Sequence, residues 1–165
     1  MLLTLDDVAY TAKPDRAEFA RLMNRMKKTA PQEVDKRVFC EHVRAGRSWV
    51  GGAFDDGLKT FRSWQVAALD FDDGRLSPVE VLDRCELLGI APLCLYFTLS
   101  ATVENPRFRL VFMLDKPLAD EAKARDCIAT LLSVFPTADK KCSNANRIFL
   151  GSQGEVWTVF EVWSV

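Results

Sequence analysis

Two carboxylates stand at the end of an apolar run. Asp70 and Asp72 are two residues apart, after Val66 to Leu69. Successive side chains of a β-strand point to opposite faces, so residues at this spacing share a face, roughly 7 Å apart along the chain. Such a pair suits Mg²⁺, which prefers a few carboxylates together with phosphate oxygens and water. Because Asp-x-Asp also ends many ordinary strands, the pair is informative only together with other groups on the same face.

Three arginines are the candidates for those other groups. Arg107 and Arg109 alternate with apolar residues in a predicted strand, and Arg147 begins a short apolar segment. The forked donors of arginine suit carboxylates and phosphates. Carboxylates and arginines on one face are what nucleotidyl transfer by two metal ions needs. One ion activates a 3′-hydroxyl group and the other stabilises the leaving pyrophosphate.

The elements that must position these groups follow from hydrophobic periodicity and turn residues. Strands are predicted at 65–71, 93–99, 107–114 and 147–150, and the last begins a strand pair with 155–162. Helices are predicted at 14–28, 31–43, 77–89 and 119–134. Asp55-Asp56-Gly57 predicts a hairpin turn. From residue 65 to 151 the order is β-α-β-β-α-β, the split βαβ arrangement also called ferredoxin-like or RRM-like.

This order predicts an α+β fold in which two helices cover one face of a four-stranded sheet and leave the other face open. Alternation then places the apolar side chains under the helices, and it brings Asp70, Asp72 and the arginines together on the open face. We predict a single domain over residues 1–165, with an N-terminal helical and hairpin extension over 1–62 and an RRM-like core over 63–165.

Composition excludes several classes of protein. The five cysteines of this 165-residue chain are scattered without a Cys-x-x-Cys pair, which excludes a disulfide framework or a zinc knuckle. His42 is the single histidine, which excludes the paired-His metal site of rolling-circle relaxases. No apolar run approaches the ~20 residues that span a bilayer, so we predict a cytoplasmic protein without a membrane partner. The net charge of −1 gives no overall basic field, so any contact with nucleic acid must depend on local charge.

Three segments resemble the motifs of archaeo-eukaryotic primases, in the order in which that family has them. Residues 67–72 resemble the first motif, an apolar strand that ends in Asp-x-Asp. Residues 96–100 and 105–112 are similar to the second-motif region of primase-like replication proteins of phages and plasmids. Residues 139–143 and 146–151 resemble the third motif, in which one Asp completes the metal site and an Arg-x-Phe strand follows. The resemblance covers about residues 47 to 151.

The resemblance implies an enzyme with the primase fold, a metal-dependent nucleotidyltransferase acting as a DNA-directed primase or primase-polymerase in the replication of a phage, plasmid or other mobile element. Its Mg²⁺ or Mn²⁺ ligands and catalytic residues would be Asp70, Asp72 and Asp139. Its nucleotide contacts would come from Ser100, Thr102, Arg107, Arg109 and Arg147, and Lys140 and Lys141 are candidates for holding nucleic acid. The implied partners are nucleoside triphosphates and a single-stranded DNA template, with a replicative helicase as a further candidate.

The sequence departs from the family in the second motif. There the family commonly has Ser-x-His, and the His contacts the phosphates of the incoming nucleotide. This chain has Ser100-Ala101-Thr102, and His42 lies far upstream on a predicted helix as an ordinary helix residue. Either Thr102 and the arginines make the phosphate contact, or the chain is a catalytically degenerate primase-fold protein that serves as a nucleic-acid-binding or regulatory module. A non-catalytic RRM-like module and a metal-dependent phosphodiesterase are further alternatives.

Overall fold

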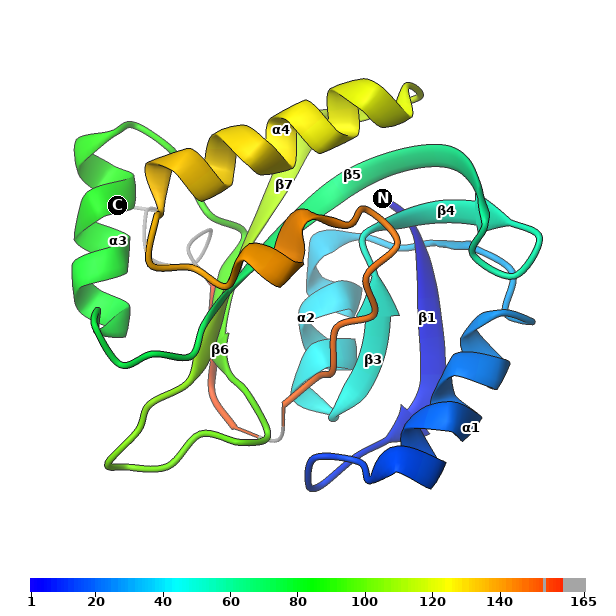
Figure 1. The fold of residues 1–165 in the computed structure, drawn as a ribbon, viewed down its shortest axis with the longest axis horizontal. Helices are drawn as coiled ribbons and strands as arrows, with labels where there is room; N and C mark the ends of the chain where they lie inside the picture. Colours follow the sequence, from blue (N-terminus) through cyan, green and yellow to red (C-terminus); the bar gives the residue numbers. More distant parts are fainter. Residues whose placement is uncertain (153, 159–165) are drawn as a thin grey trace.

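The computed structural model describes residues 1–152 and 154–158, which form two antiparallel sheets and four α-helices (Figure 1). The strands are β1 (Leu2–Ala9), β2 (Gln32–Glu33), β3 (Arg47–Val50), β4 (Gly52–Asp55), β5 (Thr60–Phe71), β6 (Cys94–Phe97), β7 (Phe108–Leu118) and β8 (Val156–Thr158). The α-helices are α1 (Arg16–Met26), α2 (Lys36–Arg44), α3 (Pro78–Leu87) and α4 (Glu121–Val134). Lys140–Ser143 forms a short 3-10 helix.

The larger sheet has the strand order β4-β5-β7-β6-β8, and the smaller sheet has the order β2-β1-β3. In the larger sheet the register places Asp70 opposite Arg109, and Arg109 opposite Tyr96. Directly opposed residues of antiparallel strands point to the same face. A row of three polar side chains therefore crosses β5, β7 and β6.

Helices α1 and α3 begin within two residues of their predicted starts, whereas the helix predicted over 31–43 begins only at Lys36, because Gln32–Glu33 pairs with β1 as strand β2. Ser77 caps α3 by accepting from the amide of Glu80, whose side chain accepts from the amide of Ser77 in return, and Pro78 occupies the first helical position. Asp15 and Glu18 form the same capping box at α1. The predicted starts of α1 and α3 are therefore confirmed.

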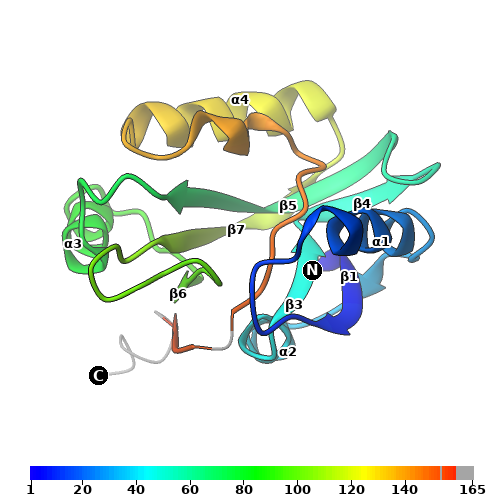
Figure 2. The ribbon, with the colours of Figure 1, turned by 60° about the horizontal axis from the view of Figure 1, so that its bottom comes forward.

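The apolar side of the β5–β7 pair packs against α4, as the alternation predicted. Phe71 and Phe112 both contact the ring of Phe135, which follows α4, with centroid separations of 6.1 and 6.0 Å. Figure 2 shows α4 on one side of the larger sheet and the N-terminal elements on the other. Asp70 and Asp72 point away from α4, toward those N-terminal elements.

The prediction that this second face would be open is wrong. The first 50 residues cover it, and Tyr96 is fully buried there. Trp49 of β3 packs between the rings of Phe39 on α2 and Phe149, with both centroid separations at 4.9 Å. The chain passes from β3 of the smaller sheet into β4 of the larger sheet through Gly51, so the two sheets are joined edge to edge.

The predicted last strand at 147–150 does not join the larger sheet. Phe149 pairs instead with Trp49, exchanging backbone hydrogen bonds of 2.8 and 2.9 Å. The edge beside β5, which a ferredoxin-like order reserves for that strand, is taken by β4. The predicted strand at 155–162 coincides with β8 over Val156–Thr158 and otherwise lies outside the described residues.

Strand β1 was not predicted from the sequence. Its residues Leu3, Thr4, Leu5 and Asp6 are all buried, so the strand lacks the alternation that marks a half-exposed strand. Residue 62, where the extension was predicted to meet the core, lies inside β5. The division into extension and core therefore stays a prediction.

Candidate functional site

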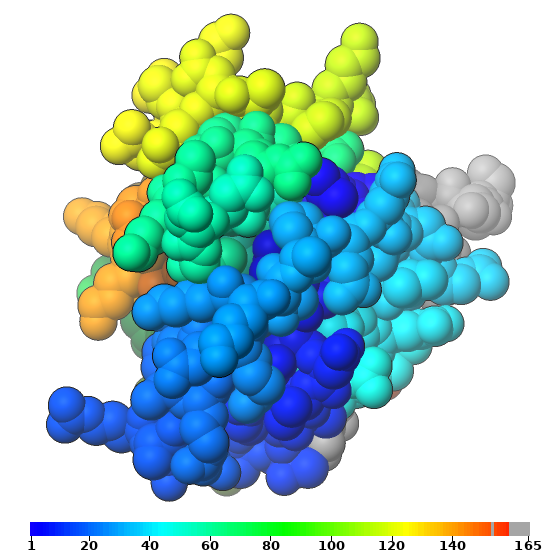
Figure 3. Space-filling view, turned by 90° about the vertical axis from the view of Figure 1, so that its right-hand side faces the viewer, coloured from blue at the N-terminus to red at the C-terminus, as the bar shows by residue number. Residues whose placement is uncertain are grey.

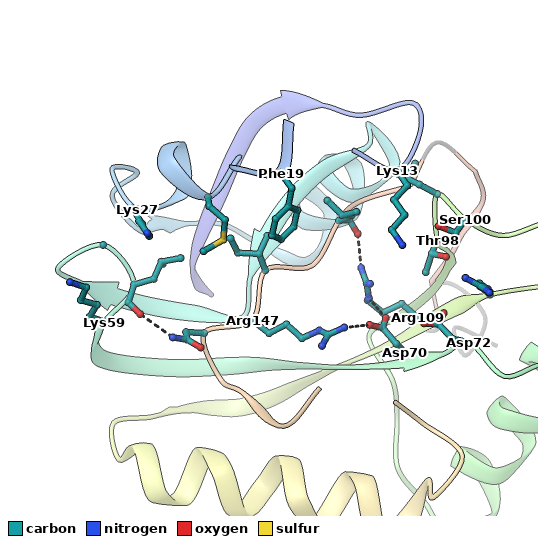
Figure 4. Close-up of a pocket in the computed structure, with 18 residues that line it drawn as sticks. Lys13, Phe19, Lys27, Lys59, Asp70, Asp72, Thr98, Ser100, Arg109 and Arg147 are labelled. Carbon is teal, nitrogen blue, oxygen red and sulfur yellow. Dashed lines mark hydrogen bonds and ion pairs between the residues drawn. The ribbon is translucent and has the colours of Figure 1, made fainter. Parts of the chain in front are cut away.

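A cavity of about 600 Å³ lies between the polar face of the larger sheet and the N-terminal elements (Figure 4). The sheet and the loop after β6 contribute Asp70, Asp72, Thr98, Leu99, Ser100, Arg107 and Arg109. The segment after the 3-10 helix contributes Asn146, Arg147, Ile148 and Leu150. Helix α1 and its flanks contribute Lys13, Phe19, Met23 and Lys27, and the β4–β5 turn contributes Gly57, Leu58 and Lys59.

Most of the residues singled out from the sequence meet in this cavity. They are Asp70, Asp72, Ser100, Arg107, Arg109 and Arg147. The cavity lining does not include Thr102, Asp139, Lys140 or Lys141. Thr102 accepts a hydrogen bond from the Asn105 amide within its own loop, and the two lysines lie on the 3-10 helix. The functional roles of these residues stay predictions.

Asp70 is held by two arginines. Arg109 Nε donates to one carboxylate oxygen, and Arg147 Nη2 donates to the other at 2.9 Å. Asp70 is 3% exposed and Arg109 7%. Burial opposes ionisation of Asp70, but the charges and hydrogen bonds of Arg109 and Arg147 outweigh it and lower the pKa of the carboxyl group. Asp70 is therefore an ionised carboxylate with both oxygens engaged.

Arg109 is anchored by several groups of the protein. Its Nη1 donates to the Tyr96 hydroxyl at 2.8 Å and to the Leu150 carbonyl at 2.6 Å, and its Cζ lies 4.7 Å from the centroid of the Phe149 ring. Trp49 Nε1 donates to the same Tyr96 hydroxyl at 3.0 Å. Burial raises the pKa of Tyr96 to about 12, so the phenol keeps its proton at neutral pH. Arg109 thus positions Asp70 from within the core.

Tyr96 and Trp49 were missed as site residues by sequence reasoning. Alternation did place Tyr96 on the face of Asp70, and that was the available signal. Nothing in the sequence marks Trp49, because its contact with Tyr96 joins residues 47 positions apart.

The ion pairs of Asp70 predict a pH dependence of stability. A carboxyl group whose pKa is lowered by folding contributes stability above its unfolded value, 3.8, and loses it as the pH falls through the folded pKa. We expect the free energy of unfolding in urea to fall more steeply below about pH 4 in the wild type than in Asp70→Asn. The raised pKa of Asp72 acts with the opposite sign, so Asp72→Asn should not flatten this acid limb. If the free energy of unfolding falls equally steeply below about pH 4 in the wild type and in Asp70→Asn, the lowered pKa of Asp70 is contradicted.

Asp72 and Arg107 are two neighbouring cavity residues that are still available to a ligand. Asp72 is exposed and makes no hydrogen bond or ion pair within residues 1–152 and 154–158. Partial desolvation by the cavity walls and the charge of Asp70 raise the pKa of Asp72, so a nearby cation would stabilise its ionised form. The Nε of Arg107 is buried without a hydrogen-bond partner in the described structure. A carboxylate lacking a cation and a guanidinium lacking an anion therefore share one cavity.

The three predicted metal ligands do not form one cluster. Arg147 Nη2 lies 2.9 Å from Asp70 Oδ2 and 3.7 Å from Asp139 Oδ2, so an arginine stands between these two carboxylates. The described part of the chain contains no group of three or more His, Cys, Asp or Glu residues that could hold a metal ion. Both oxygens of Asp70 are engaged by arginines, so a Mg²⁺ or Mn²⁺ bound in this cavity would be held by Asp72 and would take its other ligands from phosphate and water. The role of Asp139 as a third ligand stays a prediction.

The cavity has a strong local charge. Six basic side chains line it, namely Lys13, Lys27, Lys59, Arg107, Arg109 and Arg147, against the two carboxylates of Asp70 and Asp72. The whole chain carries a net charge of −1. The positive charge is therefore concentrated at the cavity, which favours an anionic ligand.

His42 lies outside this cavity. Its Nε2 is 3.0 Å from the Ser48 carbonyl oxygen, and burial lowers the pKa of the imidazole. His42 lies on α2, so its predicted position on a helix is confirmed.

No model of a known protein family matches the sequence, and no curated protein matches it. Within the described residues, no helix has the length and apolar character needed to span a membrane. Among solved structures, the chain is similar to the archaeo-eukaryotic primase domain of the primase-polymerase of cyanophage S-2L, with a TM-score of 0.52 and 17% sequence identity. The similarity covers 95% of this chain and 78% of that one. At this identity the likeness concerns the fold, and the chain accordingly has the mixed α+β fold of an archaeo-eukaryotic primase domain.

Proposed function

We propose that this chain is a primase-type nucleotidyltransferase domain, of the DNA-directed primase or primase-polymerase kind used by phages, plasmids and other mobile elements. Its cavity binds the triphosphate of a nucleotide beside Asp72 and Arg107. The observation that carries the proposal is that the Asp72 carboxylate, which has no hydrogen bond or ion pair within the described residues, shares a basic cavity with Arg107, whose buried Nε has no hydrogen-bond partner there. The primase-like fold supports the same assignment.

Each cavity residue has a distinct role in this proposal. Asp72, with Asp70 behind it, holds Mg²⁺ or Mn²⁺, which would neutralise the phosphates and promote attack by a 3′-hydroxyl group. Arg107 and Ser100 contact the phosphates, and Arg147 can turn to them from the cavity wall because it is 26% exposed. Arg109 positions Asp70. Asp139 remains a candidate third metal ligand and Thr102 a candidate phosphate contact, and Lys140 and Lys141 remain candidates for holding nucleic acid.

A second function has a specific observation in its favour. Both oxygens of Asp70 are engaged by arginines, and the second motif lacks the family's histidine. A degenerate primase-fold module would use the same basic cavity to bind nucleic acid or nucleotide without a metal ion. Dependence on a divalent cation separates the two functions.

The test is calorimetric titration of a nucleoside triphosphate with Mn²⁺, with Mg²⁺, and with EDTA. We expect wild-type binding to require the cation, and Asp72→Asn to remove that requirement together with most of the affinity. Arg107→Gln should weaken binding by roughly 10- to 100-fold, because a hydrogen bond to a charged group contributes about 1.5–3 kcal/mol. Asp73→Asn is the matched control, since Asp73 pairs with Arg75 outside the cavity.

Two other outcomes are decisive. Binding that is equally strong in EDTA and in Asp72→Asn would favour the degenerate module. A folded wild-type protein that binds no triphosphate under any condition would refute the nucleotidyltransferase. If cation-dependent binding is found, primer synthesis on a single-stranded template is the next measurement.

A further inference from the structure

The cavity continues well beyond the carboxylates. In Figure 4, Asp72 and Ser100 lie at one end, Lys27 and Lys59 lie at the other, and Phe19 lies between them. The triphosphate proposed above accounts for the Asp72 end alone. That proposal assigns no ligand to the other end, which Lys27 and Lys59 line.

The middle of the cavity has an apolar wall. Phe19 of α1 is 41% exposed although it lines the cavity, and Met23 lies one helical turn further along. Leu58 and Ile148 complete the wall. An aromatic ring partly exposed beside cationic groups is the usual platform on which an unpaired base stacks.

The far end is basic and is built by two segments that touch. The side chain of Lys27 packs against the β4–β5 turn, where a Cβ added to Gly57 would lie 3.3 Å from it. Figure 3 shows the N-terminal segments and the green β4–β5 turn side by side on this face of the molecule. Lys59 follows the same turn, and both lysines are exposed. Neither makes an ion pair within the described residues, so both ammonium groups are available to an anion.

The turn that carries this end is held in an unusual conformation. Leu58 has a φ of +72°, which bulky residues rarely adopt, and it is 7% exposed. Asn146 Nδ2 donates to the Leu58 carbonyl at 3.1 Å. This link ties the turn to the segment that carries Arg147, so the basic end and the carboxylate end are held in one frame.

We infer that α1 and the β4–β5 turn form a track for single-stranded nucleic acid, in which a base stacks on Phe19 and the strand's phosphates lie against Lys27 and Lys59. A mononucleotide carries phosphate at one end only, so it cannot use two separate basic ends with an apolar wall between them. A strand of two or more nucleotides has phosphates on both sides of an unpaired base. This inference rests on the proposed function, because that function assigns the Asp72 end of the cavity to the triphosphate. Its test does not depend on that function, because it measures binding of the strand directly.

The test is fluorescence anisotropy of a labelled ten-nucleotide oligo-dT strand with the full chain. We expect Phe19→Leu to weaken binding by roughly fivefold or more, because a base–aromatic stack contributes at least about 1 kcal/mol. The variant Lys27→Gln/Lys59→Gln should weaken binding and lower the slope of log K against log salt by about 1.4, since each phosphate contact with a single strand contributes about 0.7. Lys36→Gln and Val38→Ala, exposed on α2 outside the cavity, are the matched controls.

The same variants are titrated with a nucleoside triphosphate. For Lys27→Gln/Lys59→Gln, a loss of triphosphate affinity much smaller than the loss of strand affinity supports a separate track, and so does unchanged triphosphate affinity in Phe19→Leu. Loss of triphosphate affinity in Phe19→Leu would overturn the inference, because the ring would then hold the base of the nucleotide. Unchanged strand affinity in all variants would also overturn it. If wild type binds the strand through these residues but binds no triphosphate, the proposed function fails and the track stands.

Discussion

Replacement of Asp70 by alanine should lower the free energy of unfolding by about 3–5 kcal/mol, because it leaves the buried Arg109 without its counter-ion. Asp72→Asn should change it by less than about 0.5 kcal/mol, because Asp72 is exposed and unpaired in the described structure. Urea unfolding followed by circular dichroism measures both values. The two carboxylates of one Asp-x-Asp motif therefore have different roles, since Asp70 stabilises the fold and Asp72 is available to a ligand.

The double variant Asp70→Leu/Arg109→Met is the control for this interpretation. Replacing both partners of a buried ion pair by apolar residues is often neutral, whereas removing one partner leaves a buried charge. Arg147, at 26% exposure, can then turn to water. We expect the double variant to recover most of the lost stability. If Asp70→Ala proves no more costly than Asp72→Asn, Asp70 is not held by its arginines and is freer to act as a ligand than we propose.

This difference affects how nucleotide binding is tested. A loss of binding in an Asp70 variant has two explanations, a missing ligand and a disturbed core. A loss of binding in Asp72→Asn has one explanation, a missing ligand. Asp72 is therefore the better probe of cation-dependent binding, although the sequence places both residues equally.

Gly51→Ala should lower the free energy of unfolding by about 3 kcal/mol or more, as overpacking against fixed backbone does at its upper range. A Cβ at this position would overlap the Val66 carbonyl oxygen and lie 3.0 Å from its carbonyl carbon. The backbone cannot give way, because the amides of Gln65 and Val66 both donate to the Gly51 carbonyl, at 3.1 and 3.0 Å. Thermal and urea unfolding of the purified variant measure the effect.

Gly154→Ala is the matched control for this substitution. Among the described residues a Cβ there would meet only Ser152 Oγ, at 3.5 Å, an ordinary contact, so we expect a change of less than about 0.5 kcal/mol. A Gly51→Ala variant as stable as Gly154→Ala would show that the junction between the two sheets can shift. The cavity walls carried by the two sheets would then be less rigidly positioned relative to each other than the structure implies.

Much of the fold and of the candidate site could be predicted from sequence signals that act over a few residues. Strand alternation placed Asp70 and Asp72 on one face and Phe71 on the other, and the helix predicted over 77–89 agrees with α3, whose start has a capping box at Ser77. The order of strands and helices between residues 65 and 134 follows from the same periodicities, because burying one face of an element imposes a repeat of two or 3.6 residues. The shared face of Asp70, Arg107 and Arg109 could therefore be predicted.

Only the tertiary structure decided how those groups are paired and what faces them. Arg147 reaches Asp70 across 77 residues, and Phe19 of α1 faces the same cavity, yet no repeat in the sequence relates these positions. β4 occupies the sheet edge expected for residues 147–150, which instead pair with β3. Leu3 to Asp6 of β1 are buried on both faces of the strand and so carry no alternating pattern. Such contacts depend on the packing of whole elements against one another, and local periodicity contains no information about which distant elements meet.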